Sequence, residues 1–475
     1  MRLPANKTKI VCTIGPASES VEVLKQLIEA GMNIARINFS HADFDSHEKV
    51  IANIRTAARA TGRRVAIMGD LPGPKMRIGQ LAEEPVQLNP GDPLTLTSEE
   101  ILGSKERVSM SFPRLPQVVK AGDTLFLNDG LIQLEVEKAV GTEVHCRVVV
   151  GGELRSRKGL NLPDIDLGIG AFTERDQQCL RFAMEKGVDA ISQSFVESAA
   201  DIRAVRQAAA SLGHEPFIIA KLERSSAREH LDGILDAADG IMVARGDLGV
   251  EIPIEWIAVA QKEIIRRANL LGKPVITATQ MLESMTDNRR PTRAEATDVA
   301  NAILDGTDCV MLSEESAMGK YPVDAAAMLA KIAAATEPTR PGHKVREILR
   351  TFDGKVDFSM RDLLTLSVET LIDRVAPALV LVPSISGATA RSITRFRLPV
   401  WIAAVSTREK VCQQLMFSYG IWPVHEPEQP DDWKGYARNW LQSAELQGNL
   451  VVLSTGPSPK YPEANHRIEI IDLNR

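Results

Sequence analysis

Short runs of apolar and β-branched residues recur along the first two thirds of the chain, and a stretch with helical periodicity follows most of them. Such near-continuous apolar runs are typical of parallel strands that are buried on both faces. Their alternation with helices predicts an α/β fold, a (β/α)8 TIM barrel, with an open doubly wound sheet as the alternative. The runs cover residues 9–14, 33–40, 65–70, 189–195, 217–223, 241–247, 275–279 and 309–313.

The third strand–helix unit is interrupted by a different pattern. Between about residues 73 and 166, short alternating runs are separated by turn signals, such as those at 89–92 and 128–130. These signals predict a small β-barrel domain of antiparallel strands, inserted at the C-terminal end of strand three. An insertion at that point can act as a lid over the barrel mouth.

Beyond about residue 341 the spacing changes again. Apolar runs at 378–383, 400–405, 450–453 and 468–471 alternate with helical patterns, as in an open α/β domain. We therefore expect three domains, which are a (β/α)8 barrel of residues 1–70 and 168–340, an inserted lid of residues 71–167, and a C-terminal α/β domain of residues 341–475.

Composition narrows the class of protein. With 44% hydrophobic and 25% charged residues, the 475-residue chain has a globular rather than a disordered balance. Its net charge of −6 gives no support to nucleic acid or a membrane surface as the main partner. No apolar segment has the length of a signal-peptide core or a bilayer span, so we expect a soluble cytoplasmic protein. Five scattered cysteines argue against a structural zinc site or a disulfide framework.

Charged and hydroxyl residues gather where the predicted barrel strands end, which is where such barrels place their catalytic groups. Residues two apart in a strand share a face, so Lys221 and Glu223 point the same way. Burying many polar groups is costly unless they are partnered. An ion-pair network that closes the barrel top is the alternative interpretation. The residues concerned are Arg36, Asn38, Ser40, Asp70, Lys221, Glu223, Asp247, Thr277 and Thr279.

These residue types suit metal-assisted chemistry on a small phosphorylated acid. Glu223 and Asp247 offer two hard oxygen donors, a minimal set for Mg²⁺. Arg36 presents a planar pair of donors that fits a phosphate or a carboxylate. Lys221 is a compact charge that can stabilise a transferring phosphoryl group. Gly246 lets backbone N–H groups approach an anion closely.

Several common nucleotide and metal motifs are missing from the sequence. It contains no Gly-x-x-x-x-Gly-Lys-[Ser/Thr] loop, no Gly-x-Gly-x-x-Gly after a strand and no His-Glu-x-x-His. Any nucleotide is therefore held by an arrangement other than a P-loop or a Rossmann turn.

Taken together, the sequence resembles pyruvate kinase over essentially the whole chain. The resemblance implies transfer of a phosphoryl group from phosphoenolpyruvate to ADP, which gives pyruvate and ATP in the final step of glycolysis. It also implies a homotetramer. The segments that carry the resemblance are 9–17, 36–41, 69–77, 158–163, 242–251, 277–285 and 293–306.

The resemblance implies roles for the charged strand-end residues. Arg36 would hold the substrate phosphate, and Lys221 would stabilise the transition state as the phosphoryl group moves. Glu223 and Asp247 would bind Mg²⁺ or Mn²⁺.

The resemblance also divides the remaining contacts between the two substrates. Backbone groups at Gly246 and Asp247, with the Thr279 hydroxyl, would hold the carboxylate and enolate end, and Thr279 or a water beside it lies near where the enolate is protonated. Lys158 sits at the return hinge of the lid, so closure would bring it over the nucleotide phosphates. The implied nucleotide contacts are Asn38, Phe39, Ser40, His41, Arg77 and Lys158.

One departure from the family concerns a monovalent cation. Family members that need K⁺ place an acid after the Gly-Pro of Asp-Thr-Lys-Gly-Pro-Glu, whereas this chain has Lys75 there. A fixed ammonium supplies positive charge that K⁺ would otherwise provide and repels a K⁺ beside it, so we expect an enzyme that works without K⁺. Alternatively, Lys75 pairs with Asp70 or a lid carboxylate and leaves the site intact. The K⁺ ligands by similarity are Asn38, Ser40, Asp70 and the Leu71 carbonyl.

Residues 384–389 follow a predicted strand and open a helix in the C-terminal domain. Small hydroxyl residues and free N–H groups there suit a phosphate, and an ordinary βα turn is an equal alternative. The family places a sugar-phosphate or nucleotide effector here, which implies allosteric regulation. The residues concerned are Ser384, Ser386, Gly387 and Thr389.

Milder departures from the family occur at Ala42, Arg224 and Glu314, and none removes a catalytic group.

Two other functions compete with this assignment. A metal-dependent aldolase acting on phosphoenolpyruvate or pyruvate also uses a Glu/Asp pair and an arginine, but it does not call for a lid with a nucleotide-facing Lys158. A sugar-phosphate-binding regulator that kept the fold is the non-enzymatic alternative, and the intact Arg36, Lys221 and Glu223 argue against it.

Overall fold

Eight parallel strands form a closed barrel in the computed structural model, which describes residues 3–340, 359–457, 463 and 465–475. The order around the barrel is β1-β16-β15-β14-β13-β12-β3-β2. Each strand pairs with the next barrel strand along the chain, including β3 with β12 across the inserted lid, and β16 pairs with β1 to close the barrel. This confirms the (β/α)8 barrel and excludes the doubly wound sheet. The strands are β1 (Lys9–Thr13), β2 (Met32–Asn38), β3 (Ala66–Leu71), β12 (Ala190–Gln193), β13 (Phe217–Leu222), β14 (Gly240–Ala244), β15 (Val275–Ala278) and β16 (Cys309–Leu312).

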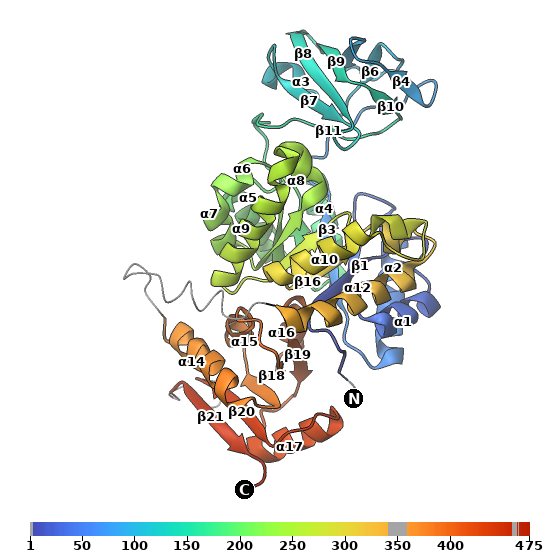
Figure 1. The fold of residues 1–475 in the computed structure, drawn as a ribbon. Coiled ribbons are helices and arrows are strands. Elements are labelled where there is room, and N and C mark those ends of the chain that lie inside the picture. The colour runs from blue at the N-terminus through green and yellow to red at the C-terminus, as the bar shows by residue number, and fades with distance from the viewer. Residues whose placement is uncertain (1–2, 341–358, 458–462, 464) are drawn as a thin grey trace.

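Helices cover the outside of the barrel (Figure 1). The capping box expected at the start of one of them is present, because the Thr292 side chain accepts from the Glu295 N–H and the Glu295 carboxylate accepts from the Thr292 N–H. The barrel helices are α1 (Val21–Ala30), α2 (Phe44–Thr61), α4 (Glu174–Glu185), α5 (Ala199–Ser211), α6 (Ser226–Glu229), α7 (Leu231–Ala237), α8 (Arg245–Glu251), α9 (Ile257–Leu270), α10 (Arg293–Asp305), α11 (Glu314–Ala317) and α12 (Pro322–Thr336), with short 3-10 turns η1 (Ile254–Trp256), η2 (Glu283–Thr286) and η3 (Glu337–Thr339).

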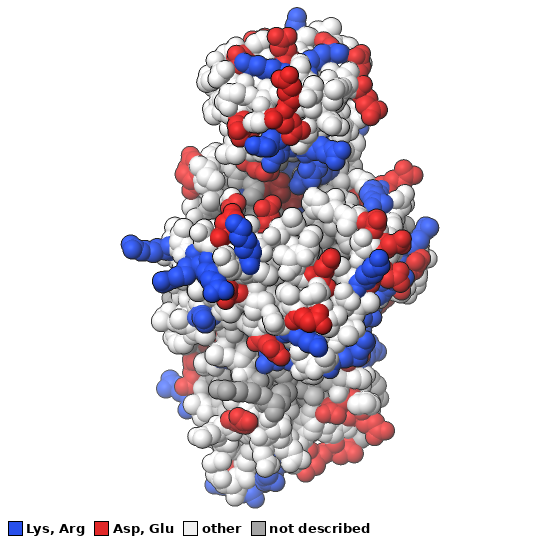
Figure 2. Space-filling model, turned by 90° about the vertical axis from the view of Figure 1, so that its right-hand side faces the viewer, with Lys and Arg blue, Asp and Glu red and all other residues white. Residues whose placement is uncertain are grey.

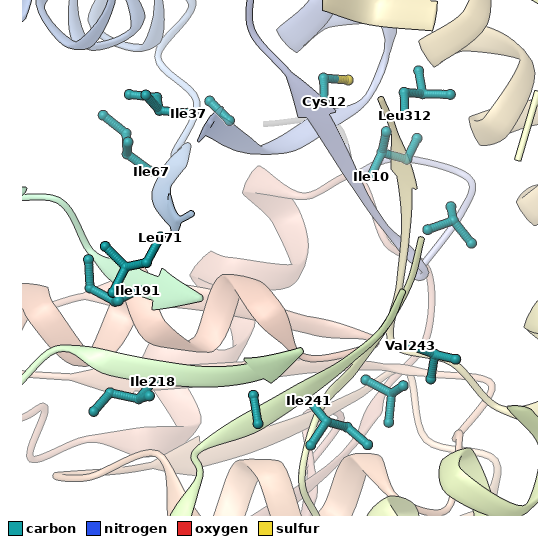
Figure 3. Close-up of a cluster of buried hydrophobic side chains, with 14 of the residues drawn as sticks. Ile10, Cys12, Ile37, Ile67, Leu71, Ile191, Ile218, Ile241, Val243 and Leu312 are labelled. Carbon is teal, nitrogen blue, oxygen red and sulfur yellow. The ribbon is translucent and has the colours of Figure 1, made fainter. Parts of the chain in front are cut away.

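Alternate residues of each barrel strand fill two separate cores. Outward-facing side chains, among them Ile10, Ile67 and Ile218, pack beneath the helices, and Figure 3 shows them around the strands. Their sequence neighbours Val11 and Met68 belong to a second cluster. Both faces of each strand are therefore apolar along most of its length, which explains the near-continuous apolar runs.

The lid stands apart from the barrel at one end of the molecule and has its own hydrophobic core (Figure 1). A six-stranded sheet of order β11-β7-β8-β9-β5-β6 is mostly antiparallel, and β10 pairs with β4 in a two-stranded sheet. The lid elements are β4 (Val86–Leu88), β5 (Pro93–Thr97), β6 (Arg107–Ser109), α3 (Leu115–Val118), β7 (Thr124–Leu127), β8 (Ile132–Val140), β9 (Glu143–Val150), β10 (Gly152–Leu154) and β11 (Leu160–Asn161).

The C-terminal part of the chain forms an open five-stranded sheet of order β19-β18-β17-β20-β21, parallel except for the last pair. This confirms an open α/β domain, although its predicted start at residue 341 lies outside the described residues. Its elements are α14 (Met360–Val375), β17 (Leu379–Pro383), α15 (Ala388–Thr394), β18 (Trp401–Ser406), α16 (Glu409–Gln414), η4 (Leu415–Phe417), β19 (Ile421–His425), α17 (Trp433–Ser443), β20 (Leu450–Thr455) and β21 (Arg467–Asp472).

A short turn of the C-terminal domain closes the bottom of the barrel. Phe417 of η4 is fully buried in the inner barrel cluster and stacks on Phe217 of β13, with ring centroids 5.4 Å apart. Nearby, the Arg397 guanidinium pairs with Asp308 at 2.7 Å, and both side chains are buried. The opposite end of the barrel faces the lid (Figure 1). Within the described ranges, no helix has the length and apolar character needed to cross a bilayer.

Candidate active site

Three charged side chains from three different strands meet at the lid end of the barrel. Arg36 of β2 donates through Nε to Asp70 Oδ2 of β3 at 2.9 Å, and its Nη2 contacts the same oxygen. Lys221 Nζ of β13 lies 3.4 Å from that oxygen. Arg36 Nη1 also donates to Thr13 Oγ1 at 2.9 Å, which fixes the guanidinium from the β1 side. The side chains of Arg36 and Lys221 are each only 11% exposed, so they retain little water.

Lys221 is the centre of a second set of contacts. Its ammonium lies 2.8 Å from Glu223 Oε1 and donates to Ser194 Oγ at 2.7 Å. The other carboxylate oxygen of Glu223 accepts from the Phe195 N–H at 2.7 Å. Phe195 has a φ of 57°, an uncommon value for a bulky residue, which turns the backbone so that this N–H faces Glu223.

The charged groups of this cluster shift one another's pKa values. Burial alone would raise the pKa of Asp70, but the nearby Lys221 and Arg36 outweigh it and hold that pKa below its usual value. Burial would lower the pKa of Lys221, whereas Asp70 and Glu223 raise it above the ordinary lysine value. The ammonium is therefore charged at neutral pH. Burial raises the pKa of Glu223, Lys221 opposes that shift, and the charge of Asp247 adds to it.

Glu223 and Asp247 fit a divalent cation. Asp247 lies in the first turn of α8, which follows β14, and β14 pairs with β13, the strand that Glu223 directly follows. Among the described residues there is no group of three or more His, Cys, Asp or Glu side chains that could hold a metal by themselves. Two carboxylates suit Mg²⁺, which usually keeps waters and takes further oxygen ligands from a phosphorylated substrate.

Strand β15 ends in a strained turn that faces helix α8. Thr279 has a φ of 67°, which is a genuine outlier for a β-branched residue. Its Oγ1 accepts from the Gly246 N–H at 2.7 Å and donates to the Ala278 carbonyl at 2.6 Å. Arg245 donates to the Thr279 carbonyl at 2.8 Å and pairs with Asp298 at 2.6 Å. These contacts hold the hydroxyl beside the first turn of α8.

Positive charge collects where the barrel meets the base of the lid. Burial lowers the pKa of His41, and the charges of Arg77, Lys75 and Arg36 lower it further, in that order. The charge of Glu314 opposes these three cations. In Figure 2, Lys and Arg side chains gather at the junction between lid and barrel. Such a field favours a polyanion such as a nucleotide phosphate chain.

The two connections between barrel and lid lie side by side. Residues Arg77 and Gly159 form an antiparallel bridge, and the Ile78 N–H donates to the Lys158 carbonyl at 2.9 Å. Arg77 Nη1 donates to the Arg157 carbonyl at 2.9 Å. The outgoing and returning segments therefore hold Arg77 and Lys158 together at the hinge.

Phe39 occupies a different environment from the other predicted nucleotide contacts. Its ring is 2% exposed and packs edge-on against His47 and Phe182. Any nucleotide contact of this residue would therefore come from its backbone. The loop that follows is tied by Asn38, whose Oδ1 accepts from the Ser40 N–H at 3.1 Å.

The oxygens assigned to K⁺ already have partners within the chain. Asp70 Oδ1 accepts from Ser192 Oγ at 2.7 Å, and the Leu71 carbonyl accepts from Ser194 Oγ at 2.7 Å. Lys75 is exposed and, among the described residues, forms no ion pair with Asp70 or with a lid carboxylate. The alternative in which Lys75 is neutralised by such a pair therefore has no support.

The loop assigned to an effector joins β17 to α15. Gly387 has a φ of 77°, and its N–H donates to Ser384 Oγ at 2.9 Å. The Ser386 hydroxyl lies 3.4 Å from the Ala388 nitrogen, and Thr389 is half-buried in the first turn of α15. The hydroxyls thus satisfy the loop's own N–H groups, as they would in an ordinary βα turn.

Three residues of this site were not predicted from the sequence, which are Ser192, Ser194 and Thr13. Ser192 and Ser194 end the fourth strand of the barrel with the same two-residue spacing as Lys221 and Glu223, so the strand alternation could have identified them. Thr13 carries no comparable signal, because its role depends on the neighbouring strand.

Comparison with known proteins gives a consistent result over the whole chain. The family model described as "Pyruvate kinase, barrel domain" matches residues 5–326, and the one described as "Pyruvate kinase, alpha/beta domain" matches residues 363–467. The chain is 49% identical over 424 residues to the pyruvate kinase of Thermococcus litoralis, which covers 89% of each chain. It is 43% identical over 460 residues to that of Geobacillus stearothermophilus (95% of this chain, 77% of the relative) and 38% identical over 462 residues to that of Thermotoga maritima (96% and 98%).

Proposed function

The chain belongs to the pyruvate kinase family, and from that premise we propose which of its residues carry out the reaction. It is a phosphotransferase, and the reaction of the family is phosphoryl transfer from phosphoenolpyruvate to ADP, which gives pyruvate and ATP. The observation that carries the residue assignment is the chain of alternating charges Arg36–Asp70–Lys221–Glu223 at the barrel mouth.

Arg36 and Lys221 hold the phosphoryl group of phosphoenolpyruvate. Asp70 and Thr13 fix the Arg36 guanidinium, so it is oriented before the substrate arrives. Lys221 stays charged in a site with little water, where its attraction for a moving phosphoryl group is strong. Orientation and charge together lower the barrier without a covalent intermediate.

Glu223 and Asp247 hold Mg²⁺ or Mn²⁺, together with oxygens of the substrates. When bound, the divalent ion neutralises charge on phosphate and enolate oxygens. The Phe195 N–H and the Lys221 ammonium orient the Glu223 carboxylate for this role.

Thr279 and the first turn of α8 receive the opposite end of phosphoenolpyruvate. The Asp247 N–H at the start of α8 is offered to its carboxylate, and the Gly246 N–H joins it when it leaves Thr279 Oγ1. The Thr279 hydroxyl, held within 2.7 Å of the Gly246 nitrogen, lies on the side where the enolate receives its proton, either from Thr279 or from a water beside it.

ADP lies between the barrel loop that follows β2 and the hinge of the lid. Arg77 and Lys158 supply the positive field for its phosphates, and Asn38, Phe39, Ser40 and His41 supply loop and backbone contacts. Access to this position depends on the lid, because Arg77 and Lys158 both belong to the hinge.

The reaction needs no K⁺. Lys75 contributes to the same positive field as Arg77, and Asp70 and the Leu71 carbonyl already accept hydrogen bonds from serines. Together with Asn38 and Ser40, these oxygens would form the K⁺ site found by similarity. An ammonium nearby and internal partners both weaken the attraction of that set for a monovalent cation.

Further properties follow as proposals from the family. The domains are the barrel (residues 1–70 and 168–340), the lid (71–167) and a C-terminal domain (341–475) that regulates the enzyme by binding a sugar phosphate or nucleotide. Ser384, Ser386, Gly387 and Thr389 would contact that effector. The enzyme would act as a cytoplasmic homotetramer.

The test is the initial rate of pyruvate formation from phosphoenolpyruvate, ADP and Mg²⁺ in potassium-free buffer, followed by a K⁺ titration. We expect full activity without K⁺ and none without ADP. ADP-dependent turnover separates this reaction from that of an aldolase. A rate that appears only with K⁺ would reject the role of Lys75 while leaving the reaction intact.

A further inference from the structure

Arg224 directly follows Glu223 in the chain, and its guanidinium lies beneath the segment that returns from the lid to the barrel. Arg224 Nη1 donates to the Leu162 carbonyl at 3.2 Å, and Nη2 donates to the Ile165 carbonyl at 2.7 Å. The side chain is only 4% exposed. Charged donors in a rigid fork make strong, directional hydrogen bonds, so one side chain fixes two points of the return segment.

Two carboxylates of the barrel fix the guanidinium from the other side. Glu251 Oε1, at the end of α8, lies 3.1 Å from Arg224 Nη1, and Glu197 Oε1 lies 3.3 Å from Nε. Glu251 is itself buried, with 2% of its side chain exposed. Removing the guanidinium would leave a buried carboxylate without its partner, which is costly. Arg224 therefore connects the return segment of the lid to the carboxylates of the barrel.

Neighbouring contacts fasten the same part of the lid. Ser225 Oγ donates to Asp164 Oδ1 at 2.8 Å, and Asp164 has a left-handed φ of 57°. On α8, Val250 lies against the lid turn at Gly130, where an added Cβ would come within 3.2 Å of its Cγ2. The base of the lid is thus held on the side of β13 and α8.

The fastened segment leads directly to Lys158. Only residues 159–161 separate Lys158 from Leu162, and two of them form β11, which pairs with β7 of the lid. The Leu160 N–H also donates to the Met76 carbonyl of the outgoing segment at 3.0 Å. Because this short strand is paired on both sides, a displacement at residues 162–165 is passed on to Lys158.

We propose that Arg224 is a positioning residue for the nucleotide, which fastens the return segment of the lid so that Lys158 meets the phosphates of ADP. Arg224 acts through the Leu162 and Ile165 carbonyls and does not touch the substrates. The proposal rests on the nucleotide role given to Lys158 above. It also explains why an arginine stands at this departure from the family pattern, since a shorter neutral side chain has no fork to span both carbonyls.

The experiment compares Arg224→Gln and Arg224→Lys with the unchanged enzyme and with Arg228→Gln as a matched control. Arg228 pairs with Glu263 of α9, so Arg228→Gln also removes an Arg–Glu pair from this region. Amide hydrogen exchange of the free proteins measures the return segment without any turnover, and steady-state kinetics give separate KM values for ADP and phosphoenolpyruvate.

For Arg224→Gln we expect exchange at residues 160–166 to be about 10- to 100-fold faster, the range that corresponds to the loss of charged hydrogen bonds. The KM for ADP should rise about tenfold, while the KM for phosphoenolpyruvate changes less than about twofold. Arg224→Lys should recover part of both effects, and Arg228→Gln should show neither.

Unchanged exchange at residues 160–166, or equal changes in both KM values, would overturn the proposal. Faster exchange with an unchanged KM for ADP would also overturn it, because Arg224 would then serve stability alone. If Arg224→Gln does not fold, Arg224→Lys and Ser225→Ala are judged by the same criteria. Failure of the proposed function is distinguishable, since the unchanged enzyme itself would then lack ADP-dependent turnover.

Discussion

Lys221 Nζ lies 2.8 Å from Glu223 Oε1, so the ammonium proposed to stabilise the phosphoryl group forms an ion pair with a carboxylate proposed to bind metal. The two residues stand two positions apart at the end of β13 and share a face. A cation that binds Glu223 through Oε1 competes with Lys221 for that oxygen. Metal binding and release of the ammonium toward substrate are therefore linked.

Replacing Lys221 with alanine should lower kcat by about 10²- to 10³-fold, the usual cost of losing one group that stabilises the transition state. The KM for phosphoenolpyruvate should change much less than kcat, because Arg36 keeps its contacts to Asp70 and Thr13 and still holds the phosphate. Steady-state kinetics at saturating Mg²⁺ measure both values. A variant that retains most of its rate would remove Lys221 from this role.

Glu223→Gln or Asp247→Asn should raise the Mg²⁺ concentration for half-maximal rate by about 10- to 100-fold, since each removes one of two anionic oxygen donors. A Mg²⁺ titration at saturating substrates measures the shift. Glu29→Gln is a suitable control, because Glu29 is an exposed acid on α1. An unchanged titration in the Glu223 and Asp247 variants would place the metal elsewhere.

Lys75→Glu should create a K⁺ requirement by replacing a fixed cation with an anion. Without K⁺ we expect the rate to fall about tenfold or more, and added K⁺ should restore it, because a mobile cation then supplies the missing charge. The measurement is a K⁺ titration at constant ionic strength, with Lys75→Gln as the control that removes charge without adding an acid. A glutamate variant that ignores K⁺ would contradict this account.

Asp189 should make the free energy of unfolding depend on pH. Burial raises its pKa to about 6, although its carboxylate accepts from the Ile67 N–H at 2.8 Å. A raised folded-state pKa means that the folded protein binds more protons than the unfolded chain between about pH 4 and pH 6, so this contribution to stability falls as pH rises through that window.

The matching variant is Asp189→Asn, which keeps a side-chain oxygen for the Ile67 N–H and cannot ionise. Urea unfolding gives the free energy of unfolding of each protein. The value for Asp189→Asn minus the value for the unchanged protein should be about 2–3 kcal/mol larger at pH 7 than at pH 4. Taking the difference between the two proteins removes the titration of all other groups. If the difference in the free energy of unfolding stays constant between pH 4 and pH 7, ionisation of Asp189 does not affect stability.

Much of this architecture could be predicted from the sequence because its signals are local. Each barrel strand is apolar on both faces and ends in polar residues, so both the barrel and the positions of Lys221 and Glu223 follow from the spacing alone. Ser194 obeys the same alternation and was nonetheless overlooked, because a serine carries less chemical signal than a charged residue.

Other features depend on contacts that no local pattern records. The partners of Arg224 include the Leu162 and Ile165 carbonyls, which are backbone groups about sixty positions away and independent of residue type. Phe39 lies between Asn38 and Ser40 in the segment proposed to contact the nucleotide, yet its ring packs in the hydrophobic core against Phe182. Only the three-dimensional structure separates a side chain that supports a motif from one that faces a ligand.

The stacking of Phe417 on Phe217 makes the barrel dependent on a segment that is synthesised about a hundred residues after its last strand. Until η4 arrives, the inner cluster is open at its lower end, and the emerging barrel exposes apolar surface that favours aggregation. A chain cut after α12 would keep all eight strands and still lack the ring that seals them. We therefore expect the barrel and the C-terminal domain to unfold together, and the lid, which has its own hydrophobic core, to lose its structure independently.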